Sequence, residues 1–355
     1  MAREHLSLPT FKDIHQHWRH GQEWKQTPEA ASQANLAGGI SFAAAMPNNA
    51  ELTTTLSQVE GIKHDWNSRL YMDIALHLGT RGEADQPFDP AILDQVLALK
   101  AFFDITTGKH IIRGQRERMR VFERWPGAIA DGPIMVHAEQ ASLAEALAYA
   151  HLYEQEMYVC HVSSRTEVEL IRRAKDRGQA VYMEVTPHHL MLNNEMAPSP
   201  FRMMKPDLGS PDDQEALWQA ITDGTADTVG TDDAPHTKEE KQSADAPSGV
   251  SGSAETTLPV LVRAFQERGI SLTYLEKLID DNPRHIFNLP DQGDSYVDLD
   301  PNDEYIIDDE GLFTKPGWTW AKGLKGFRIV QTVINGEVKY KDGKILAEKG
   351  SGRVL

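Results

Sequence analysis

Eight short apolar segments alternate with helix-like stretches, and this alternation constrains the fold most strongly. Stretches 142–155, 166–178 and 213–224 carry amphipathic patterns, with Gly178 and Gly224 where helix C-caps belong. Strands that alternate with helices predict a parallel sheet, and eight of them predict a (β/α)8 TIM barrel. A doubly wound sheet is the alternative, but no GxGxxG opens a helix after the first segment. The predicted strands are 11–16, 40–46, 69–77, 97–103, 133–138, 157–162, 180–186 and 226–231.

The pattern changes near residue 290. Residues 291–318 are acidic and rich in turn formers, and residues 327–350 read as two strands joined at Asn335-Gly336, with a second turn at Asp342-Gly343. We therefore expect a catalytic barrel over 1–290 and a small β appendage, a reduced β-sandwich, over 291–355. Only 14 residues precede the histidine pair His15 and His17, so we expect this appendage to form mostly from C-terminal residues, or to be incomplete.

Composition narrows the classes of partner. The 355 residues include 36 basic and 53 acidic side chains, giving a net charge of −17, which argues against nucleic acid and anionic membranes as general partners. The one cysteine, Cys160, fits a reducing compartment. Residues 1–13 lack an apolar signal core, and the chain has no long apolar run. These features predict a soluble, cytoplasmic protein.

Polar residues recur at the ends of the predicted strands, where TIM barrels place their catalytic groups. His15 and His17 lie on one face of the first strand, because side chains alternate with period two. The other polar residues at this rim are Asn48 after the second strand, Lys100 within the fourth, His137, His161 and Asp232.

Each of these residues also has an ordinary structural interpretation. A lone histidine after an apolar strand is more often a buried, hydrogen-bonded residue than a ligand, and Asp232 could cap a turn. Lys100 in LALKAFF is the exception, because a lysine in an apolar strand must lose its charge, find a counter-ion or be chemically modified. Each ordinary interpretation is strong for a single residue. Together they are weak, because four histidines, one lysine and one aspartate all fall at one rim.

The ordered motifs resemble the amidohydrolase superfamily and, within it, the dihydroorotases. The resemblance runs from about residue 9 to residue 340 and is closest to the branch that includes multifunctional eukaryotic enzymes. The motifs that carry it are DIHQHWR, MPNN, VHAE, HVSS, EVTPHHL, MKPDLGSPDDQEALW, TDDAPHTKEEK, GSAETTLPVLV and NPRHIFNLP.

The resemblance implies a site with two zinc ions. His15, His17 and Asp232 would hold one zinc, and His137 and His161 the other. Lys100 would be carboxylated and bridge the two, which would also account for a lysine in an apolar strand. Zinc suits imidazole and carboxylate ligands at a hydrolytic site, although manganese, cobalt and iron stay open. Asp232 would carry the proton in reversible hydrolysis of dihydroorotate to N-carbamoyl-aspartate, a step of pyrimidine biosynthesis.

The resemblance also implies a carboxylate-binding group made of Arg19, Asn48 and His236. Lys205 stands where the closest relatives carry arginine, so a substrate contact and a surface cation are both open. In residues 104–110, Thr106 matches a threonine of a loop that closes over substrate, while Thr107 replaces an aromatic residue. HWRHGQE is one residue shorter than the family motif and lacks its proline.

Two alternatives belong to different classes of function. A hydantoinase or allantoinase also opens cyclic amides, but its substrates lack the carboxylate that Arg19, Asn48 and His236 would bind. A non-catalytic dihydroorotase-like subunit would partner aspartate transcarbamoylase, but such relatives lose metal ligands. A hydrolase of another carboxylated amide is a weaker possibility. Beyond the small-molecule substrate we expect a homo-oligomer, most simply a dimer, and possible association with aspartate transcarbamoylase.

Overall fold

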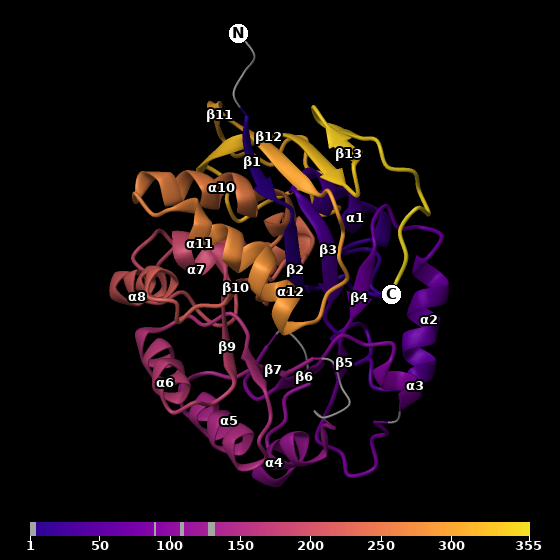
Figure 1. Cartoon of the computed structure of the whole chain (residues 1–355), viewed down its shortest axis with the longest axis vertical. Helices are drawn as coiled ribbons and strands as arrows, with labels where there is room; N and C mark the ends of the chain where they lie inside the picture. Colours follow the sequence, from indigo (N-terminus) through magenta and orange to yellow (C-terminus); the bar gives the residue numbers. More distant parts are fainter. Residues whose placement is uncertain (1–4, 89, 107–109, 127–131) are drawn as a thin grey trace.

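The computed structural model describes residues 5–88, 90–106, 110–126 and 132–355. Its centre is formed by parallel strands with helices around them (Figure 1). One parallel sheet has the order β2-β3-β4 and the other has the order β10-β9-β8-β7-β6-β5. The strands are β2 Phe11–Gln16, β3 Ile40–Ala45, β4 Ile74–Leu76, β5 Leu78–Gly79, β6 Leu99–Phe102, β7 Ile134–His137, β8 Met157–Val159, β9 Val181–Val185 and β10 Thr228–Val229.

The two sheets share one chain segment. Residues 74–76 pair with β3, and residues 78–79 pair with β6, so the segment passes from one sheet to the other at His77. The His77 backbone N–H still donates to Ala45 O at 3.0 Å, whereas that of Leu78 donates to Ala98 O at 2.9 Å. Counting this segment as one strand gives eight, in the order the sequence predicted.

The opposite junction, between β10 and β2, has no continuous ladder. A single parallel bridge joins Gln16 to Asp233, and His17 N donates to Asp233 O at 2.8 Å. The Asp13 carboxylate completes the junction by accepting from the backbone and hydroxyl of Thr231 at 3.1 and 2.5 Å. The parallel order is confirmed, and this junction relies partly on a buried side chain.

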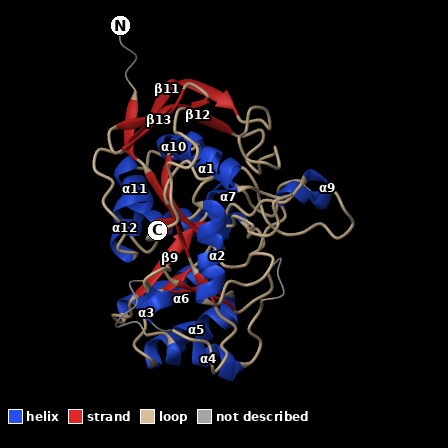
Figure 2. Cartoon of the chain, turned by 90° about the vertical axis from the view of Figure 1, so that its right-hand side faces the viewer, coloured by secondary structure: helices blue, strands red, loops and turns tan. Residues whose placement is uncertain are grey.

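Helices cover the outside of the strands, and Figure 2 shows α9 on loops that project from one side. Their ends follow local chemistry: Thr27, Thr55, Ser164 and Ser210 are N-caps whose hydroxyls accept backbone N–H groups. Gly178 and Gly224 follow two of the helices at φ +79°, as predicted for C-caps. The helices are α1 Pro28–Ala37, α2 Leu56–Trp66, α3 Pro90–Leu93, α4 Gln115–Arg124, α5 Gln140–Leu152, α6 Arg165–Asp176, α7 Pro187–Met191, α8 Pro211–Thr222, α9 Lys238–Lys241, α10 Ser253–Glu267, α11 Leu272–Glu276 and α12 Asn282–Ile286, with short turns at Pro200–Arg202 and Lys277–Asp281.

A five-stranded antiparallel sheet lies above α1 and α10 in Figure 1. It consists of β1 Leu6–Pro9, β11 Tyr296–Ile306, β12 Lys325–Ile334, β13 Glu337–Lys341 and β14 Lys344–Ile345. The turns at Asn335-Gly336 and Asp342-Gly343 join its last strands, as predicted. The sequence did not predict β1, whose pairing partner β11 lies about 290 positions away.

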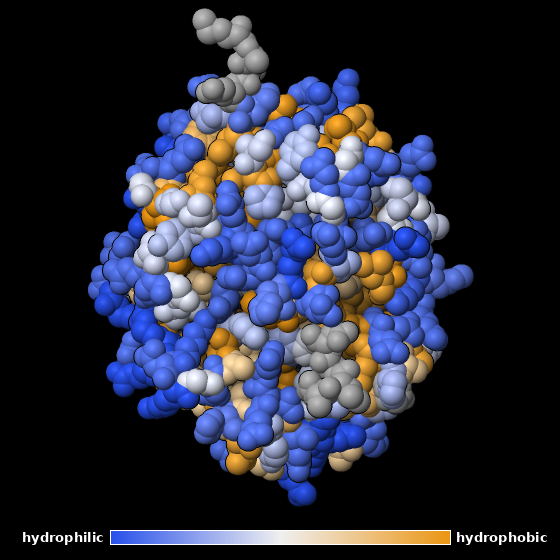
Figure 3. All heavy atoms as spheres, in the orientation of Figure 1, coloured by the Kyte–Doolittle hydropathy of each residue, from blue (hydrophilic) through white to orange (hydrophobic). Residues whose placement is uncertain are grey.

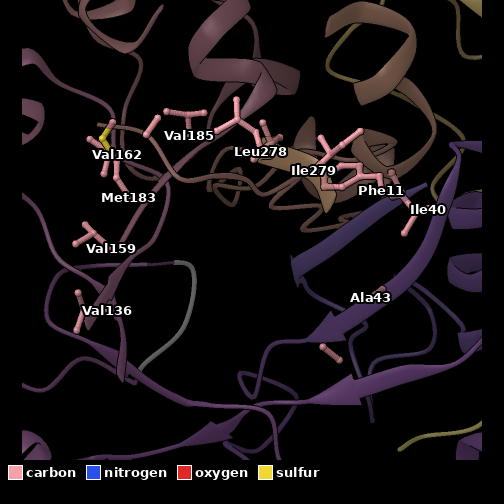
Figure 4. Close-up of a cluster of buried hydrophobic side chains, with 14 of the residues drawn as sticks. Phe11, Ile40, Ala43, Val136, Val159, Val162, Met183, Val185, Leu278 and Ile279 are labelled. Atoms are coloured by element: carbon pink, nitrogen blue, oxygen red, sulfur yellow. The ribbon is translucent and has the colours of Figure 1, made fainter. Parts of the chain in front are cut away.

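Most apolar side chains are buried between strands and helices. Figure 4 shows part of this cluster, where β2, β3, β7, β8 and β9 contribute Phe11, Ile40, Val136, Val159 and Met183. The face shown in Figure 3 is mostly hydrophilic, with scattered apolar patches, in keeping with the net charge of −17. Within the described residues, no helix is both long and apolar enough to span a bilayer.

The third predicted strand, 69–77, was too long. Residues 69–73 form turns and bends, and the strand begins at Ile74. Leu70 is nevertheless buried in the apolar core, and its carbonyl accepts from Gly350 N at 2.8 Å in the C-terminal segment. The apolar pattern of residues 69–77 therefore predicted burial correctly but placed the start of the strand too early.

Candidate metal centre and active site

Ten of the eleven predicted site residues line one pocket at the ends of the parallel strands. The exception is His236, which lies directly behind Arg19. The residues that line the pocket are His15, His17, Arg19, Asn48, Lys100, Phe102, Thr106, His137, His161, Lys205, Asp232, Ala234, Ser248 and Gly249. Thr107, the loop position next to Thr106, lies outside the described residues.

His15, His17 and Asp232 form the first donor group. Asp232 Oδ1 lies 3.3 Å from His15 Nε2 and 2.9 Å from His17 Nε2, and one ligand atom from each residue falls within 4.8 Å of the others. Burial lowers the pKa of His17 to about 4, so this imidazole is neutral at pH 7 and can act as a ligand. The predicted common face of the two histidines is confirmed by this geometry.

His137 and His161 form the second donor group. His137 Nδ1 lies 2.9 Å from His161 Nε2, while His137 Nε2 and His161 Nδ1 are buried with no hydrogen-bond partner among the described residues. Burial lowers the pKa of His137 to about 3 and that of His161 well below its usual value. Buried polar atoms are normally satisfied, so two neutral imidazoles with orphaned nitrogens fit a bound metal ion.

Lys100 lies among these groups with its side chain fully buried. Its Nζ donates to Cys160 Sγ at 2.7 Å and lies 5.3 Å from the centre of the Phe102 ring. Among the described residues it forms no ion pair. A buried lysine without a carboxylate partner, beside four histidines, fits a role in holding metal ions better than a structural role.

Three site residues have left-handed backbones although none is glycine. The φ angles are +62° at Arg19, +38° at His161 and +43° at Asp232. Such conformations cost free energy, on the order of 1–3 kcal/mol each, and persist only where the surrounding structure imposes them. They turn the chain sharply as it leaves β2, β8 and β10, which directs these side chains into the shared pocket.

Glu184 and Asn48 orient the imidazoles of His15 and His17. Glu184 is fully buried in β9, and its Oε1 lies 2.8 Å from His15 Nδ1 and accepts from His161 N at 2.7 Å. Asn48 Oδ1 lies 2.7 Å from His17 Nδ1. Each contact engages Nδ1 of its imidazole and leaves Nε2 pointing toward Asp232. Partners of metal-binding histidines commonly orient them in this way. The sequence signal for Glu184, an acidic residue in an apolar strand, was the same as for Lys100 and was missed.

Cys160 lies beside the candidate metal centre, whereas the sequence suggested only that a single cysteine fits a reducing compartment. His15, Cys160 and Glu184 offer a second set of three ligand atoms within 4.8 Å of one another. Glu184 and Asp232 outweigh the desolvation of His15 and raise its pKa well above the usual value. This histidine therefore lies in a negative potential that attracts cations.

Arg19 lies at the centre of the side of the pocket that the sequence predicts to bind a carboxylate. Burial lowers its pKa to about 10, so the guanidinium stays charged at neutral pH. Its Nη2 lies 3.2 Å from His236 Nε2. Lys205 lines the same pocket and forms an ion pair with Asp207 at 2.6 Å. Arg19, His236 and Lys205 thus lie together as predicted, with Asn48 facing His17 from the same rim.

Lys241 organises this side of the pocket from behind. Its ammonium is fully buried and donates to the carbonyls of Met203, Pro247 and Gly249 at 3.0, 2.8 and 2.9 Å. Burial lowers its pKa to about 8. Three carbonyls converging on one ammonium tie the segment before Lys205 to the pocket-lining Gly249. The sequence shows this residue only as the last letter of TDDAPHTKEEK.

Comparison with known proteins places this geometry in a family. No protein-family model matches the chain. The chain is 32% identical over 386 residues to a dihydroorotase of Staphylococcus epidermidis, covering 97% of this chain and 89% of that protein. The chain belongs to the dihydroorotase family. It is also 35% identical over 354 residues to the multifunctional protein CAD of Squalus acanthias, but spans only 15% of that protein's length.

Solved structures agree on the dihydroorotase-family fold. An L-hydantoinase (dihydropyrimidinase) from Arthrobacter aurescens superposes with a TM-score of 0.90 at 22% identity, covering 99% of this chain and 88% of that one. An inactive dihydroorotase-like domain of a Chaetomium thermophilum CAD-like multifunctional protein gives a TM-score of 0.81 at 22% identity, covering 99% of both chains. At such identities these likenesses concern the fold alone.

Proposed function

We propose that this chain is a metal-dependent dihydroorotase, which reversibly hydrolyses the ring amide of dihydroorotate to N-carbamoyl-aspartate. The observation that carries the proposal is one pocket that combines six potential metal ligands with a buried, charged arginine. The ligand set alone would serve several cyclic amidohydrolases. Arg19 beside His236 favours a substrate that carries a carboxylate.

In this proposal the pocket holds two zinc ions. His15, His17 and Asp232 would hold the first, His137 and His161 would hold the second, and Lys100, carboxylated by carbon dioxide, would be a ligand to both. Two such cations would supply a hydroxide nucleophile at neutral pH and would polarise the amide carbonyl. The neutral imidazoles of His17 and His137 support this assignment, as do the ring nitrogens of His137 and His161 that lack a hydrogen-bond partner among the described residues. Lys100 supports it too, because it is buried with no ion pair in the described part of the chain.

The chain's own residues bind substrate and move the proton. Arg19 binds the substrate carboxylate, and Asn48, His236, Lys205 and Thr106 complete its surroundings. Asp232 accepts a proton from the attacking water-derived oxygen and delivers it to the ring nitrogen as the C–N bond breaks. Burial would raise the pKa of Asp232, but His15 and His17 hold it well below its usual value. The carboxylate is therefore ionised and can accept a proton.

We propose that these groups lie on a closed (β/α)8 barrel, with residues 1–290 as the catalytic domain and residues 291–355 as a β appendage. The antiparallel sheet also includes β1, so the appendage draws on both ends of the described chain. Homodimer formation, association with aspartate transcarbamoylase and a cytoplasmic location stay predictions.

One assay tests the proposal against its alternatives. Turnover of dihydroorotate, hydantoin and allantoin is measured on one sample whose metal content is also determined. We expect hydrolysis of dihydroorotate and about two metal ions per chain. Preference for hydantoin or allantoin would replace the proposal with another cyclic amidohydrolase. Absence of both metal and activity after zinc is added would favour a non-catalytic subunit.

A further inference from the structure

His236 lies between two cations, one at each ring nitrogen. Arg19 Nη2 is 3.2 Å from Nε2, and Lys25 Nζ is 3.3 Å from Nδ1. Glu240 joins the group, with Oε2 3.3 Å from Nδ1 and Oε1 3.3 Å from Lys25 Nζ. The imidazole is 1% exposed, and both cations together with burial lower its pKa far below the usual value. The ring is therefore neutral and carries a single proton.

The described contacts assign that proton as long as Arg19 contacts Nε2. Arg19 can only donate, so Nε2 must accept and the proton lies on Nδ1. Nδ1–H then donates to Glu240 Oε2, and Lys25 donates to Glu240 Oε1. Lys25 Nζ and Nδ1–H, whose nitrogens lie 3.3 Å apart, are then both donors, and Glu240 supplies the acceptor oxygen for each.

A bound carboxylate reverses the requirement at Nε2. Carboxylate oxygens only accept, so an unprotonated Nε2 facing them would be repelled, whereas Nε2–H would donate. Moving the proton to Nε2 obliges Nδ1 to accept. Among the described residues around Nδ1, only Lys25 can donate, because Glu240 cannot.

We propose that Lys25 is a positioning residue that makes His236 a hydrogen-bond donor to the substrate carboxylate, by donating to Nδ1 once Arg19 engages substrate. In this exchange one proton leaves Nδ1 for water and one enters Nε2, so the charge of the ring is unchanged. The inference rests on the proposed function only in requiring a substrate that bears a carboxylate.

The surroundings hold this group in place. The Lys25 side chain is 11% exposed, and Glu240 Oε2 also accepts from Thr237 N at 3.0 Å. The carbonyl of His236 accepts from Trp318 Nε1 at 2.7 Å, which fixes the backbone that carries the ring. Once Arg19 Nη2 turns from Nε2 toward the substrate, proton relocation is therefore the simplest response of His236 to a carboxylate.

The first test uses Lys25→Met, with Lys322→Met as a matched control whose ammonium pairs with Asp308 and Asp309 on the surface. We expect Lys25→Met to raise KM for dihydroorotate and the dissociation constant of orotate, a planar analogue with the same carboxylate, about tenfold. We expect kcat within about twofold of wild type and unchanged metal content, because Lys25 contacts neither the reacting amide nor a ligand. An unchanged KM, or an equal loss in the control, overturns the inference.

Lys25→Gln keeps a hydrogen-bond donor at this position and removes the charge. It also avoids placing an apolar side chain beside His236 and Glu240. Its amide can donate to Nδ1 without a cation, so we expect KM within about threefold of wild type. If Lys25→Gln is as impaired as Lys25→Met, charge alone matters and the proton assignment is wrong.

A double-mutant cycle with His236→Gln makes the test independent of folding effects at position 25. The glutamine amide can donate to the carboxylate without help at Nδ1, so adding Lys25→Met to His236→Gln should not weaken orotate binding further. An additive loss would overturn the inference. Failure of the proposed function is distinguished at the outset, because wild type would then neither turn over dihydroorotate nor bind orotate.

Discussion

At the scale of one residue, Lys100 is a buried side chain whose described contacts do not explain why a lysine stands there. It is fully buried, donates to a thiol and has no ion pair among the described residues. Substitution by alanine removes the bridging group proposed for the two metals. We expect Lys100→Ala to lose at least one metal ion per chain and its activity on dihydroorotate, with partial rescue by small carboxylic acids that mimic the carbamate. Metal analysis and an assay with and without propionate check this. Full activity without rescue would contradict the bridging role.

Glu184 leads to a different prediction, because it contacts two of the proposed metal ligands and has no proposed contact with the reacting amide. Its Oε1 contacts His15 Nδ1 and His161 N, and its Oε2 accepts from Tyr158 Oη at 2.8 Å. Glu184→Gln keeps the shape and removes the charge that polarises His15. We expect metal affinity to fall about 10- to 100-fold, measured by competition with a chelator. Activity at saturating zinc should recover to most of the wild-type value. If it does not recover, Glu184 takes part in the reaction itself.

The site was predictable from sequence where its chemistry depended on residue type and strand end. His15, His17, Lys100, His137, His161 and Asp232 were all found by this rule, and they line one pocket. Lys25, Glu184 and Lys241 were not, because their roles come from partners distant in sequence. Lys241, for example, reaches Met203, 38 positions earlier. A sequence pattern shows which side chains are chemically unusual and does not show which carbonyl or imidazole they meet.

At the scale of elements, the contact between α1 and α10 depends on a glycine. A Cβ at Gly38 would lie 1.8 Å from the backbone oxygen of Ala254, and backbone cannot move as a flexible side chain can. We expect Gly38→Ala to reduce the free energy of unfolding by about 3 kcal/mol, near the upper end of usual overpacking costs.

Gly61 in α2 provides the matched control, because a Cβ there meets nothing within 4 Å. We expect Gly61→Ala to raise stability by about 0.5–1 kcal/mol, since alanine loses less conformational freedom in a helix. Urea unfolding of both variants measures the difference. Equal effects would mean that α1 and α10 do not approach this closely.

The elements themselves followed from local pattern, but their pairing did not. Each of the eight predicted parallel segments contains a strand, since apolar runs between helices have few other uses. The split of residues 74–79 between two sheets and the recruitment of β1 to β11 depend on partners far along the chain. Periodicity encodes burial and leaves register to tertiary context.

At the scale of the whole molecule, an ion cluster joins distant parts of the chain. Arg69 pairs with Glu23 and with Glu29 of α1, and Lys349 also pairs with Glu29 at 3.0 Å. Hydrogen bonds from Arg69 lower the pKa of Glu29 to about 2 from 4.5. A depressed pKa means that the contribution is present above about pH 4.5 and is lost as pH falls through about 2. We expect Glu29→Gln to lower the melting temperature at pH 7 and to match wild type near pH 2. Exposed Glu51, which has no ion pair among the described residues, serves as the Glu51→Gln control.

Residues 350–355 cover an edge that the split between the parallel sheets leaves open. β4 pairs with β3 on one side only, and on the other side Ile74 N donates to Arg353 O while Leu355 N donates to Ile74 O, both at 2.9 Å. An uncovered strand edge lowers stability and invites aggregation. We expect removal of residues 350–355 to lower the melting temperature and to speed aggregation on heating, while metal content at low temperature is unchanged.

Two adjacent substitutions test whether this segment acts through its backbone. A Cβ at Gly352 would lie 2.1 Å from Met72 O, so Gly352→Ala would displace the segment without deleting it. Arg353 is exposed and contributes its backbone groups to the contact, so Arg353→Ala would leave the segment in place. We expect Gly352→Ala to reproduce the truncation and Arg353→Ala to resemble wild type, as measured by calorimetry and light scattering. If Arg353→Ala were as damaging as the truncation, the charged side chain would hold the segment and the edge-covering explanation would be wrong.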